Sequence, residues 1–160
     1  MMLKKKFKNK NILITGGTGL IGRQLTDMLV ELNANVVVAS LDEFNLNPNA
    51  SYVKIDLLDF NSCKNCTKDM DMVFHLAGIK GSIDVTKSKP ATFFVPLLLM
   101  NTNLLEAARL NKVPELVYTS SIGAYHSDEI FREEESNFEK LPMDMYPGWA
   151  KRMAELQIKA

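Results

Sequence analysis

The sequence predicts an α/β protein built on a doubly wound parallel sheet, and two observations lead to that prediction. Short apolar runs alternate five times with longer segments whose apolar residues recur at helical spacing, which is typical of a parallel sheet covered by helices on both faces. In addition, a glycine-rich turn, Thr15 to Gly22, joins the first apolar run to the first helical segment. With right-handed crossovers we expect the strand order 3-2-1-4-5, and a ligand site where the first and fourth strands end.

Each predicted strand is a short run of apolar or β-branched residues. We place the strands at 12–14, 36–39, 52–55, 73–76 and 116–119. Helices are expected at 20–32, 56–69, 91–110 and from Pro147 to the end of the sequence. Pro96 falls inside the third of these helices and predicts a kink or a late start, because proline has no N–H to donate. The polar segments 42–50, 80–89 and 127–145 are expected to be loops.

The composition suits one globular domain that buries a core. The chain has 160 residues, of which 46% are hydrophobic and 24% charged, and its net charge is zero, which gives no electrostatic reason to expect nucleic acid. The lysines between Lys4 and Lys10 form a basic run, which we interpret as a solvated leader. The longest apolar run, Phe93 to Met100, is too short to span a bilayer. We therefore expect a cytoplasmic protein without membrane or nucleic-acid partners.

The two cysteines of the chain, Cys63 and Cys66, stand three positions apart. This spacing occurs in half of a zinc site and in redox pairs. The sequence offers no second cysteine pair, and its only histidines are His75 and His126. A helix also brings any two residues three apart onto one face. We therefore predict no metal site.

The glycine-rich turn has the geometry that a bound pyrophosphate requires. Gly16 allows a sharp turn, Gly19 allows a phosphate to approach the main chain, and Gly22 allows the helix to pack closely on the strand. The first helical N–H groups, from Leu20 and Ile21 onward, have no partner within the helix and carry partial positive charge. Because a strand precedes the turn and a helix follows it, the motif predicts nucleotide binding.

Small or polar residues follow the third and fourth strands, at the edge where the ligand is expected. Asp56 either accepts a hydrogen bond from an adenine amine or caps the following helix, and both interpretations are open. Ala77 and Gly78 either leave room for a flat ring or are plain turn residues.

Beyond the fifth strand, three residues could carry acid–base chemistry. Ser121 offers a hydroxyl for a substrate oxygen, and Tyr146 and Lys151 offer a phenol and an ammonium. The positive charge of a nearby ammonium lowers the pKa of a phenol, which is otherwise about 10.

Six segments resemble the extended short-chain dehydrogenases/reductases, which are NAD(P)-dependent nucleotide-sugar epimerases and dehydratases with a Rossmann-like fold. In chain order they are Thr15-Gly-Gly-Thr-Gly-Leu-Ile-Gly22, Asp56-Leu57, His75-Leu-Ala-Gly78, Asn103-Leu-Leu-Glu-Ala-Ala108, Tyr118-Thr-Ser-Ser121 and the segment from Tyr146 to Lys151. Within this family, Trp149 to Met153 is most similar to the GDP-fucose synthase branch.

The resemblance implies a role for each candidate residue. The cofactor would be NAD or NADP, held by Gly16, Gly19, Leu20, Ile21, Gly22, Asp56, Leu57, Ala77 and Gly78. The catalytic set would be Ser121, Tyr146 as the acid–base, and Lys151, which would also bind the nicotinamide ribose.

The catalytic segment departs from the family spacing. The family places tyrosine four residues before lysine, whereas Tyr146 lies five residues before Lys151. On a regular helix at about 100° per residue, the two side chains would point roughly 140° apart. Because proline favours the first helical position and pushes the preceding residue out of helical geometry, we expect Pro147 to open the helix and Tyr146 to lie outside it.

The form of the cofactor is open. Asp42, after the second strand, could bind the ribose hydroxyls of NAD, although it stands late along the loop. Arg23 could reach the 2′-phosphate of NADP, but it is also an ordinary helix residue.

Two functions are open for a chain of this length. The leading hypothesis is the cofactor-binding part, residues 1–160, of a nucleotide-sugar epimerase, dehydratase or reductase, truncated before its last strands and its substrate-binding lobe and therefore inactive alone. The alternative is a non-catalytic NAD(P)-binding or subunit-pairing module. The resemblance implies a homodimer of the full-length form, joined through the helices at 91–110 and 147–160.

Overall fold

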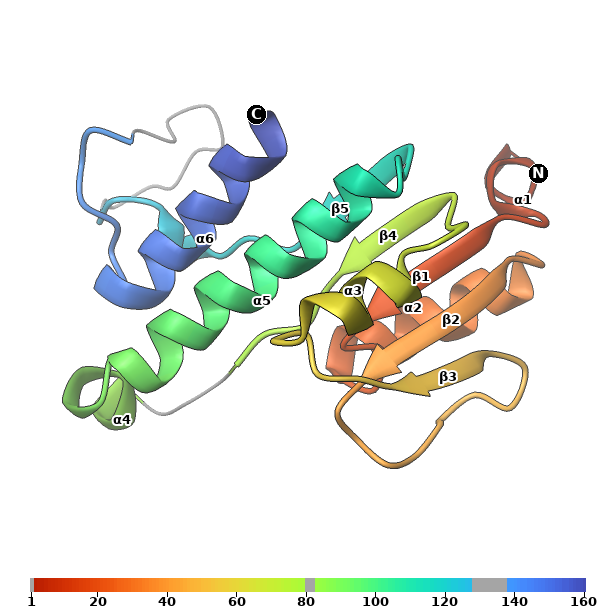
Figure 1. The fold of residues 1–160 in the computed structure, drawn as a ribbon, viewed down its shortest axis with the longest axis horizontal. Coiled ribbons are helices and arrows are strands. Elements are labelled where there is room, and N and C mark those ends of the chain that lie inside the picture. Colours follow the sequence, from red (N-terminus) through yellow and green to blue (C-terminus); the bar gives the residue numbers. More distant parts are fainter. Residues whose placement is uncertain (1, 80–82, 128–137) are drawn as a thin grey trace.

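In a computed structural model, which describes residues 2–79, 83–127 and 138–160, the chain forms a parallel sheet flanked by helices (Figure 1). The five strands lie in the order β3-β2-β1-β4-β5, so the predicted topology is confirmed. Their bounds are Asn11–Thr15 for β1, Asn35–Ser40 for β2, Ser51–Lys54 for β3, Met72–His75 for β4 and Glu115–Tyr118 for β5. All four neighbouring pairs are parallel.

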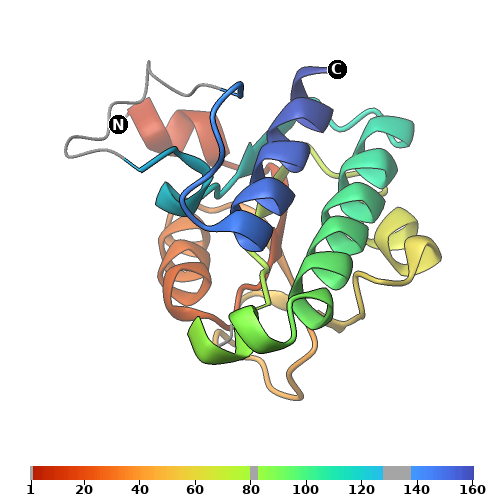
Figure 2. The same ribbon diagram turned by 90° about the vertical axis from the view of Figure 1, so that its left-hand side faces the viewer.

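The helices cover both faces of this sheet (Figure 2). Their bounds are Met2–Phe7 for α1, Leu20–Glu31 for α2, Phe60–Cys66 for α3, Ile83–Ser88 for α4, Ala91–Leu110 for α5 and Met145–Lys159 for α6, with a 3₁₀ helix η1 at Ile122–Ala124. Helix α2 packs on one face, and α3, α5 and α6 lie on the other, where α5 and α6 run side by side. The sheet is therefore doubly wound, as predicted.

The core occupies both faces because successive side chains of a strand alternate between them. Leu13 of β1 packs with Val73 and Leu104 in the cluster beneath α3 and α5. Its neighbours Ile12 and Ile14 pack in the opposite cluster. All three β1 side chains are fully buried, which explains why this strand is an uninterrupted apolar run.

Several element boundaries differ from the prediction. Helix α3 begins at Phe60, because the Asp59 carboxylate accepts hydrogen bonds from the N–H groups of Asn61 and Ser62 and caps it there. Helix α5 begins at Ala91, so the late start predicted from Pro96 is wrong. The basic leader contains α1, and the segment predicted as a loop at 80–89 contains α4. Of the two predicted loops, residues 80–82 and 128–137 lie outside the described residues.

Helix α5 is also long and apolar enough, by length and composition alone, to cross a membrane. Its buried residues include Leu97, Leu104 and Ala107, which belong to the core cluster on the sheet.

Candidate functional site

The glycine turn is built by close packing of backbone on backbone. Gly16 has φ +69°, in the left-handed region, and a Cβ added to it would lie 2.8 Å from the Cα of Ala77. A Cβ on Gly22 would lie 2.3 Å from the carbonyl oxygen of Gly16. Both positions therefore require glycine, and together they bring the start of α2 against the ends of β1 and β4.

Gly19, in contrast, leaves space at the start of α2. A Cβ added to it would meet only the Gly16 carbonyl oxygen, at 3.3 Å. Gly19 is the N-cap residue of α2 and provides no side-chain hydrogen bond. Leu20 and Ile21 are 70% and 63% exposed, so their predicted contribution comes from their N–H groups. An open helix terminus of this kind fits a pyrophosphate.

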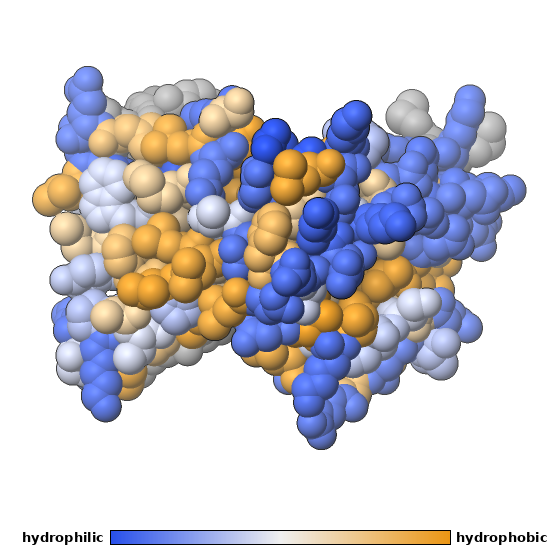
Figure 3. Space-filling model, in the orientation of Figure 1, coloured by the Kyte–Doolittle hydropathy of each residue, from blue (hydrophilic) through white to orange (hydrophobic). Residues whose placement is uncertain are grey.

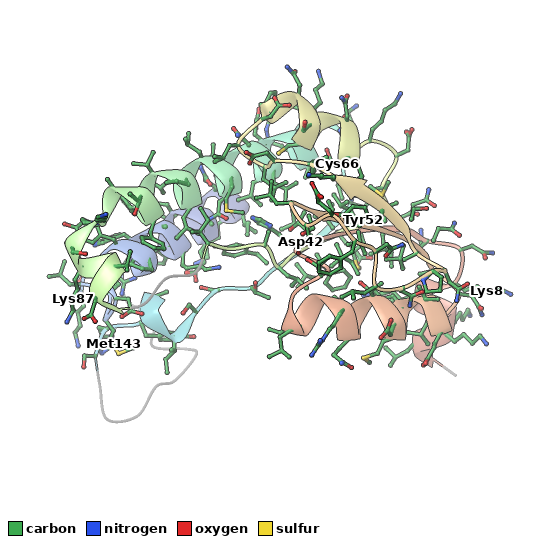
Figure 4. All side chains as sticks on the ribbon, turned by 90° about the horizontal axis from the view of Figure 1, so that it is seen from below. Lys8, Asp42, Tyr52, Cys66, Lys87 and Met143 are labelled. Atoms are coloured by element: carbon green, nitrogen blue, oxygen red, sulfur yellow. The ribbon has the colours of Figure 1, made fainter. Side chains whose placement is uncertain are left out.

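Asp42 lies beside the glycine turn. Its carboxylate accepts hydrogen bonds from the hydroxyls of Thr18 and Ser40, and the two hydroxyls lie 2.9 Å apart. The Tyr52 hydroxyl donates to the backbone carbonyl of Asp42, and Figure 4 shows these two residues side by side. The loop thus returns Asp42 to the turn, although the sequence suggested that it stands too far along.

Asp56 lies two residues beyond the end of β3, and the structure excludes one of its two interpretations, that of the helix cap. Its carboxylate accepts a hydrogen bond of 2.9 Å from the Leu58 N–H, within the loop. The cap of α3 is Asp59, so the interpretation of Asp56 as the helix cap is wrong. Asp56 itself is exposed. The side chain of Leu57 is buried in the core, so only its backbone is available to a cofactor.

Ala77 and Gly78 leave β4 next to the glycine turn. Ala77 is half-buried against Gly16, and its N–H donates to the Thr15 hydroxyl at 3.4 Å. A Cβ added to Gly78 would meet nothing within 4 Å. The end of β4 therefore has open space at its tip.

Ser121 is exposed at the N-terminus of η1, where its hydroxyl accepts a 3.1 Å hydrogen bond from the Gly123 N–H. This short helix is tied to the start of α6. Asp144 donates its N–H to the Gly123 carbonyl at 3.1 Å, and Met143 donates to the Tyr125 carbonyl at 2.6 Å. The segment carrying the predicted serine and the start of the helix carrying the predicted tyrosine are therefore held together.

Tyr146 and Lys151 both lie on α6 but contact different partners. The helix begins at Met145, so the prediction that Pro147 opens it and leaves Tyr146 outside is wrong. Proline fits the first turn because its missing N–H has no helical partner there. Tyr146 is 41% exposed, and its ring packs edge-on against Phe94, with 5.8 Å between ring centroids.

The Lys151 ammonium donates a 2.7 Å hydrogen bond to the Thr119 carbonyl and lies 4.6 Å from the centre of the Tyr118 ring. Burial lowers the pKa of Lys151, and the nearby Glu155 carboxylate opposes that shift. Within the described part of the chain, no hydrogen bond joins Lys151 to Tyr146. The structure therefore does not bring the predicted acid–base pair together.

A buried polar network that sequence reasoning missed lies between these two halves of the site. The His75 ring is 2.8 Å from the Thr15 hydroxyl and 2.9 Å from the Asn101 amide oxygen. The Asn101 amide nitrogen donates to the Tyr118 hydroxyl at 3.2 Å. Burial lowers the pKa of His75 to about 4 and raises that of Tyr118. The signal in the sequence was a polar residue, Asn101, inside an apolar helical stretch.

Arg152 is a further residue whose structural role sequence reasoning missed. Its side chain is 1% exposed. The guanidinium donates from Nε to the Ala124 carbonyl at 2.5 Å and lies 5.2 Å from the centre of the Trp149 ring. Arg152 thus fixes η1 to α6 one residue after Lys151.

The cysteine pair has no redox or metal arrangement. Cys63 and Cys66 are free thiols on α3, and each donates to a backbone carbonyl. Burial raises the pKa of Cys63 to about 12 and that of Cys66 to about 11, which suppresses the reactive thiolate. No cluster of metal-ligating side chains occurs among the residues that the structure describes.

Three known proteins that are similar to this chain are all named UDP-glucose 4-epimerases. A UDP-glucose 4-epimerase from Rickettsia bellii is 29% identical over 154 residues, which are 84% of this chain and 43% of the relative. The UDP-glucose 4-epimerase of Thermus thermophilus, solved with NAD, superposes with a TM-score of 0.77 and is 25% identical, over 93% of this chain and 50% of its own.

The UDP-glucose 4-epimerase of Thermotoga maritima, solved with UDP-glucose, superposes with a TM-score of 0.78 and is 26% identical, over 93% of this chain and 50% of its own. The chain thus spans about half the length of these relatives. The narrower likeness to the GDP-fucose synthase branch stays a prediction.

The model of one protein family matches residues 12–160, which is nearly the whole chain. Members of this family depend on NAD, so the predicted class of cofactor is confirmed at the level of the family. The open turn at Gly19 fits the pyrophosphate of such a cofactor. The chain therefore belongs to the NAD dependent epimerase/dehydratase family.

Proposed function

We propose that the chain is the cofactor-binding half of an NAD-dependent nucleotide-sugar epimerase. The single observation that carries this proposal is the open glycine turn at Gly19, where the N-terminus of α2 has no side-chain cap. The relatives named for UDP-glucose epimerisation support the substrate class. A dehydratase or reductase of nucleotide sugars also transfers a hydride between the sugar and the cofactor, and both activities remain within the proposal.

The adenosine half of the cofactor would lie along the ends of β1, β2 and β3. Its pyrophosphate would bind the first N–H groups of α2, and the exposed Asp56 would face the adenine amine. The Asp42 carboxylate would accept hydrogen bonds from the ribose hydroxyls. Because a second negative charge next to Asp42 is unfavourable, this arrangement favours NAD over NADP.

The reacting half would lie between Ala77, Gly78 and the β5–α6 segment. Bound NAD would supply hydride transfer to or from the sugar. Ser121 would hydrogen-bond the sugar oxygen, Tyr146 would move the proton, and Lys151 would bind the nicotinamide ribose. For this role the Tyr146 side chain has to leave Phe94 and turn toward Lys151.

Titration calorimetry tests the proposal directly. We expect the chain to bind NAD⁺ at one site and to bind NADP⁺ more weakly. The full-length form is then assayed with NAD⁺ and a panel of UDP-, GDP- and dTDP-sugars. Turnover of one of them identifies the substrate, and the absence of NAD⁺ binding by a folded chain would contradict the proposal.

The second candidate function is a module that binds NAD without catalysis. The observation in its favour is that Lys151 is engaged by Thr119 and Tyr118 rather than by Tyr146. The two functions differ in one measurement. A full-length form that binds NAD⁺ but shows no turnover with any nucleotide sugar would favour the module.

We further propose that the full-length protein forms a homodimer through α5 and α6. Figure 3 shows apolar side chains gathered over this part of the surface. The exposed ones include Val95 and Leu99 on α5, and Leu156 and Ile158 on α6. Burying such a surface against a second copy removes apolar area from water. A monomeric mass by light scattering at micromolar concentration would count against the dimer.

A further inference from the structure

His75 occupies a central position between the glycine turn and the Lys151 segment. Its side chain is fully buried, as are Thr15 and Asn101 on either side of it. Buried polar groups without partners are costly, so a chain of three such residues persists only where their hydrogen bonds match in direction. The directions can be assigned in this case from the donors and acceptors alone.

Asn101 sets the direction of the hydrogen bonds at one end of the network. Its amide nitrogen donates to the Tyr118 hydroxyl, so the atom facing His75 is the amide oxygen, which only accepts. His75 therefore donates from Nε2. The neutral ring then accepts at Nδ1, and the Thr15 hydroxyl is the donor there. The same hydroxyl accepts from the Ala77 N–H, so every direction is consistent with the Nε2–H tautomer.

Two routes lead from His75 to Lys151. Through the side chain, His75 holds Asn101 and Asn101 holds Tyr118, whose ring lies beneath the Lys151 ammonium. Through the backbone, the His75 carbonyl accepts the Thr119 N–H at 3.2 Å, and the Thr119 carbonyl accepts the Lys151 ammonium at 2.7 Å. The ring and the carbonyl that contact the ammonium are thus both connected to His75.

We propose that His75 is a positioning residue for Lys151. Its Nε2–H tautomer connects the end of β1, where the glycine turn begins, to Asn101 and Tyr118, and so sets the place of the ammonium relative to the turn. This inference rests on the proposed function, because Lys151 has a ribose to bind only if the chain takes up NAD.

The neutral state of His75 agrees with this role. Burial and the Lys151 charge both lower its pKa, so the ring keeps one acceptor and one donor nitrogen at neutral pH. A protonated ring would have two donors and would leave the Thr15 hydroxyl without its acceptor. Among the described residues, the Lys151 ammonium is the one charged group that shifts the pKa of His75.

Two substitutions separate the two sides of the ring. The amide of Asn reaches the place of Nδ1 and keeps an acceptor for Thr15, so His75→Asn loses the bond to Asn101. The amide of Gln reaches the place of Nε2 and keeps a donor for Asn101, so His75→Gln loses only the bond to Thr15. The two variants both carry an amide, and they differ in whether the hydrogen bond to Thr15 or the one to Asn101 is kept.

The readout is the affinity for NAD⁺ compared with that for ADP, by calorimetry. ADP carries the adenosine and pyrophosphate portion alone and does not extend to Lys151. We expect His75→Asn to weaken NAD⁺ binding roughly tenfold, the effect of one lost buried hydrogen bond, and to leave ADP binding unchanged. His75→Gln should retain most of the affinity for NAD⁺. Unchanged ADP binding also shows that each variant is folded.

The outcomes distinguish the inference from the proposed function. If both variants change the NAD⁺ to ADP ratio equally, or neither changes it, the positioning role of His75 is wrong while the proposed function stands. If the wild-type chain binds neither ligand, the proposed function fails. Whatever the binding result, ¹⁵N spectra of the His75 imidazole show which ring nitrogen carries the proton and so test the network directly. The Nε2–H tautomer is expected, and an Nδ1–H tautomer would overturn the inference.

Discussion

The two halves of the candidate site are held in place by different means. At the glycine turn, backbone packs directly on backbone, and an added Cβ on Gly16 or Gly22 would overlap main-chain atoms. At the Lys151 half, side chains from separate elements meet through hydrogen bonds, from His75 through Asn101 to Tyr118. The first half is fixed by the absence of side chains, and the second by the matching of polar ones.

This difference implies that the halves fail differently. A substitution at Gly16 or Gly22 acts on the fold, because the atoms it would overlap are main-chain atoms that cannot move aside. A substitution in the polar network changes where one group lies and how it titrates, and the sheet around it remains packed.

The largest effect is expected from Gly22→Val. Its Cβ would lie 2.3 Å from the Gly16 carbonyl oxygen and 2.6 Å from the Gly17 Cα, so the start of α2 has to move away from β1. We expect a loss of about 3 kcal/mol in the free energy of unfolding, measured by urea denaturation. The matched control is Gly78→Ala, where an added Cβ meets nothing within 4 Å. An equal loss in both variants would show that the packing at Gly22 is not special.

A pH titration of stability examines the other half. Burial lowers the pKa of His75 from 6.5 to about 4. Between these values the unfolded chain binds a proton that the folded chain does not, so stability is full above pH 6.5 and falls as the pH decreases toward 4. The change amounts to about 3 kcal/mol at most.

His75→Gln removes this contribution and leaves the carboxylates unchanged. The difference between the two stability curves therefore isolates His75. Parallel curves from pH 7 to pH 4 would contradict the burial of a neutral imidazole.

Gly19→Val should affect cofactor binding rather than the fold. The added side chain meets one carbonyl oxygen at 3.3 Å, so the stability should decrease far less than in Gly22→Val. The branched side chain would occupy the space proposed for the pyrophosphate, and NAD⁺ affinity should fall about a hundredfold as hydrogen bonds to a charged group are lost. Calorimetry on the folded variant measures this, and an unchanged affinity would remove Gly19 from the site.

The smallest effect is expected from Asp42→Asn, which removes a charge and keeps the shape. The preference for NAD⁺ over NADP⁺ should decrease about tenfold, because a negative carboxylate no longer opposes the 2′-phosphate. The measurement is the ratio of the two dissociation constants. A ratio equal to that of the wild type would mean that Asp42 does not face the ribose.

The same contrast explains how much the sequence could predict. The strand order and the glycine turn follow from local patterns, since Gly16, Gly19 and Gly22 lie three residues apart within one strand-turn-helix unit. The position of Asp42 beside Thr18 depends on the path of a loop, which no periodicity encodes. The network from His75 to Tyr118 joins three elements distant in sequence, so no spacing rule reveals it.

The start of α6 shows a different limit. Proline is favoured at the first helical position, yet it is also tolerated throughout the first turn, where its N–H is not needed. The sequence therefore could not distinguish a helix that begins at Pro147 from the observed one that begins at Met145. That difference of two residues places Tyr146 inside the helix and against Phe94.

The central claim is that NAD binds along the carboxyl ends of the strands, across both halves of the site. Backbone amide shifts of the ¹⁵N-labelled chain, recorded during titration with NAD⁺, test it most directly. We expect the largest changes at Gly19, Leu20 and Ile21, with further changes near Asp42 and Gly78. Changes confined to other parts of the chain, or none at saturating NAD⁺, would contradict it.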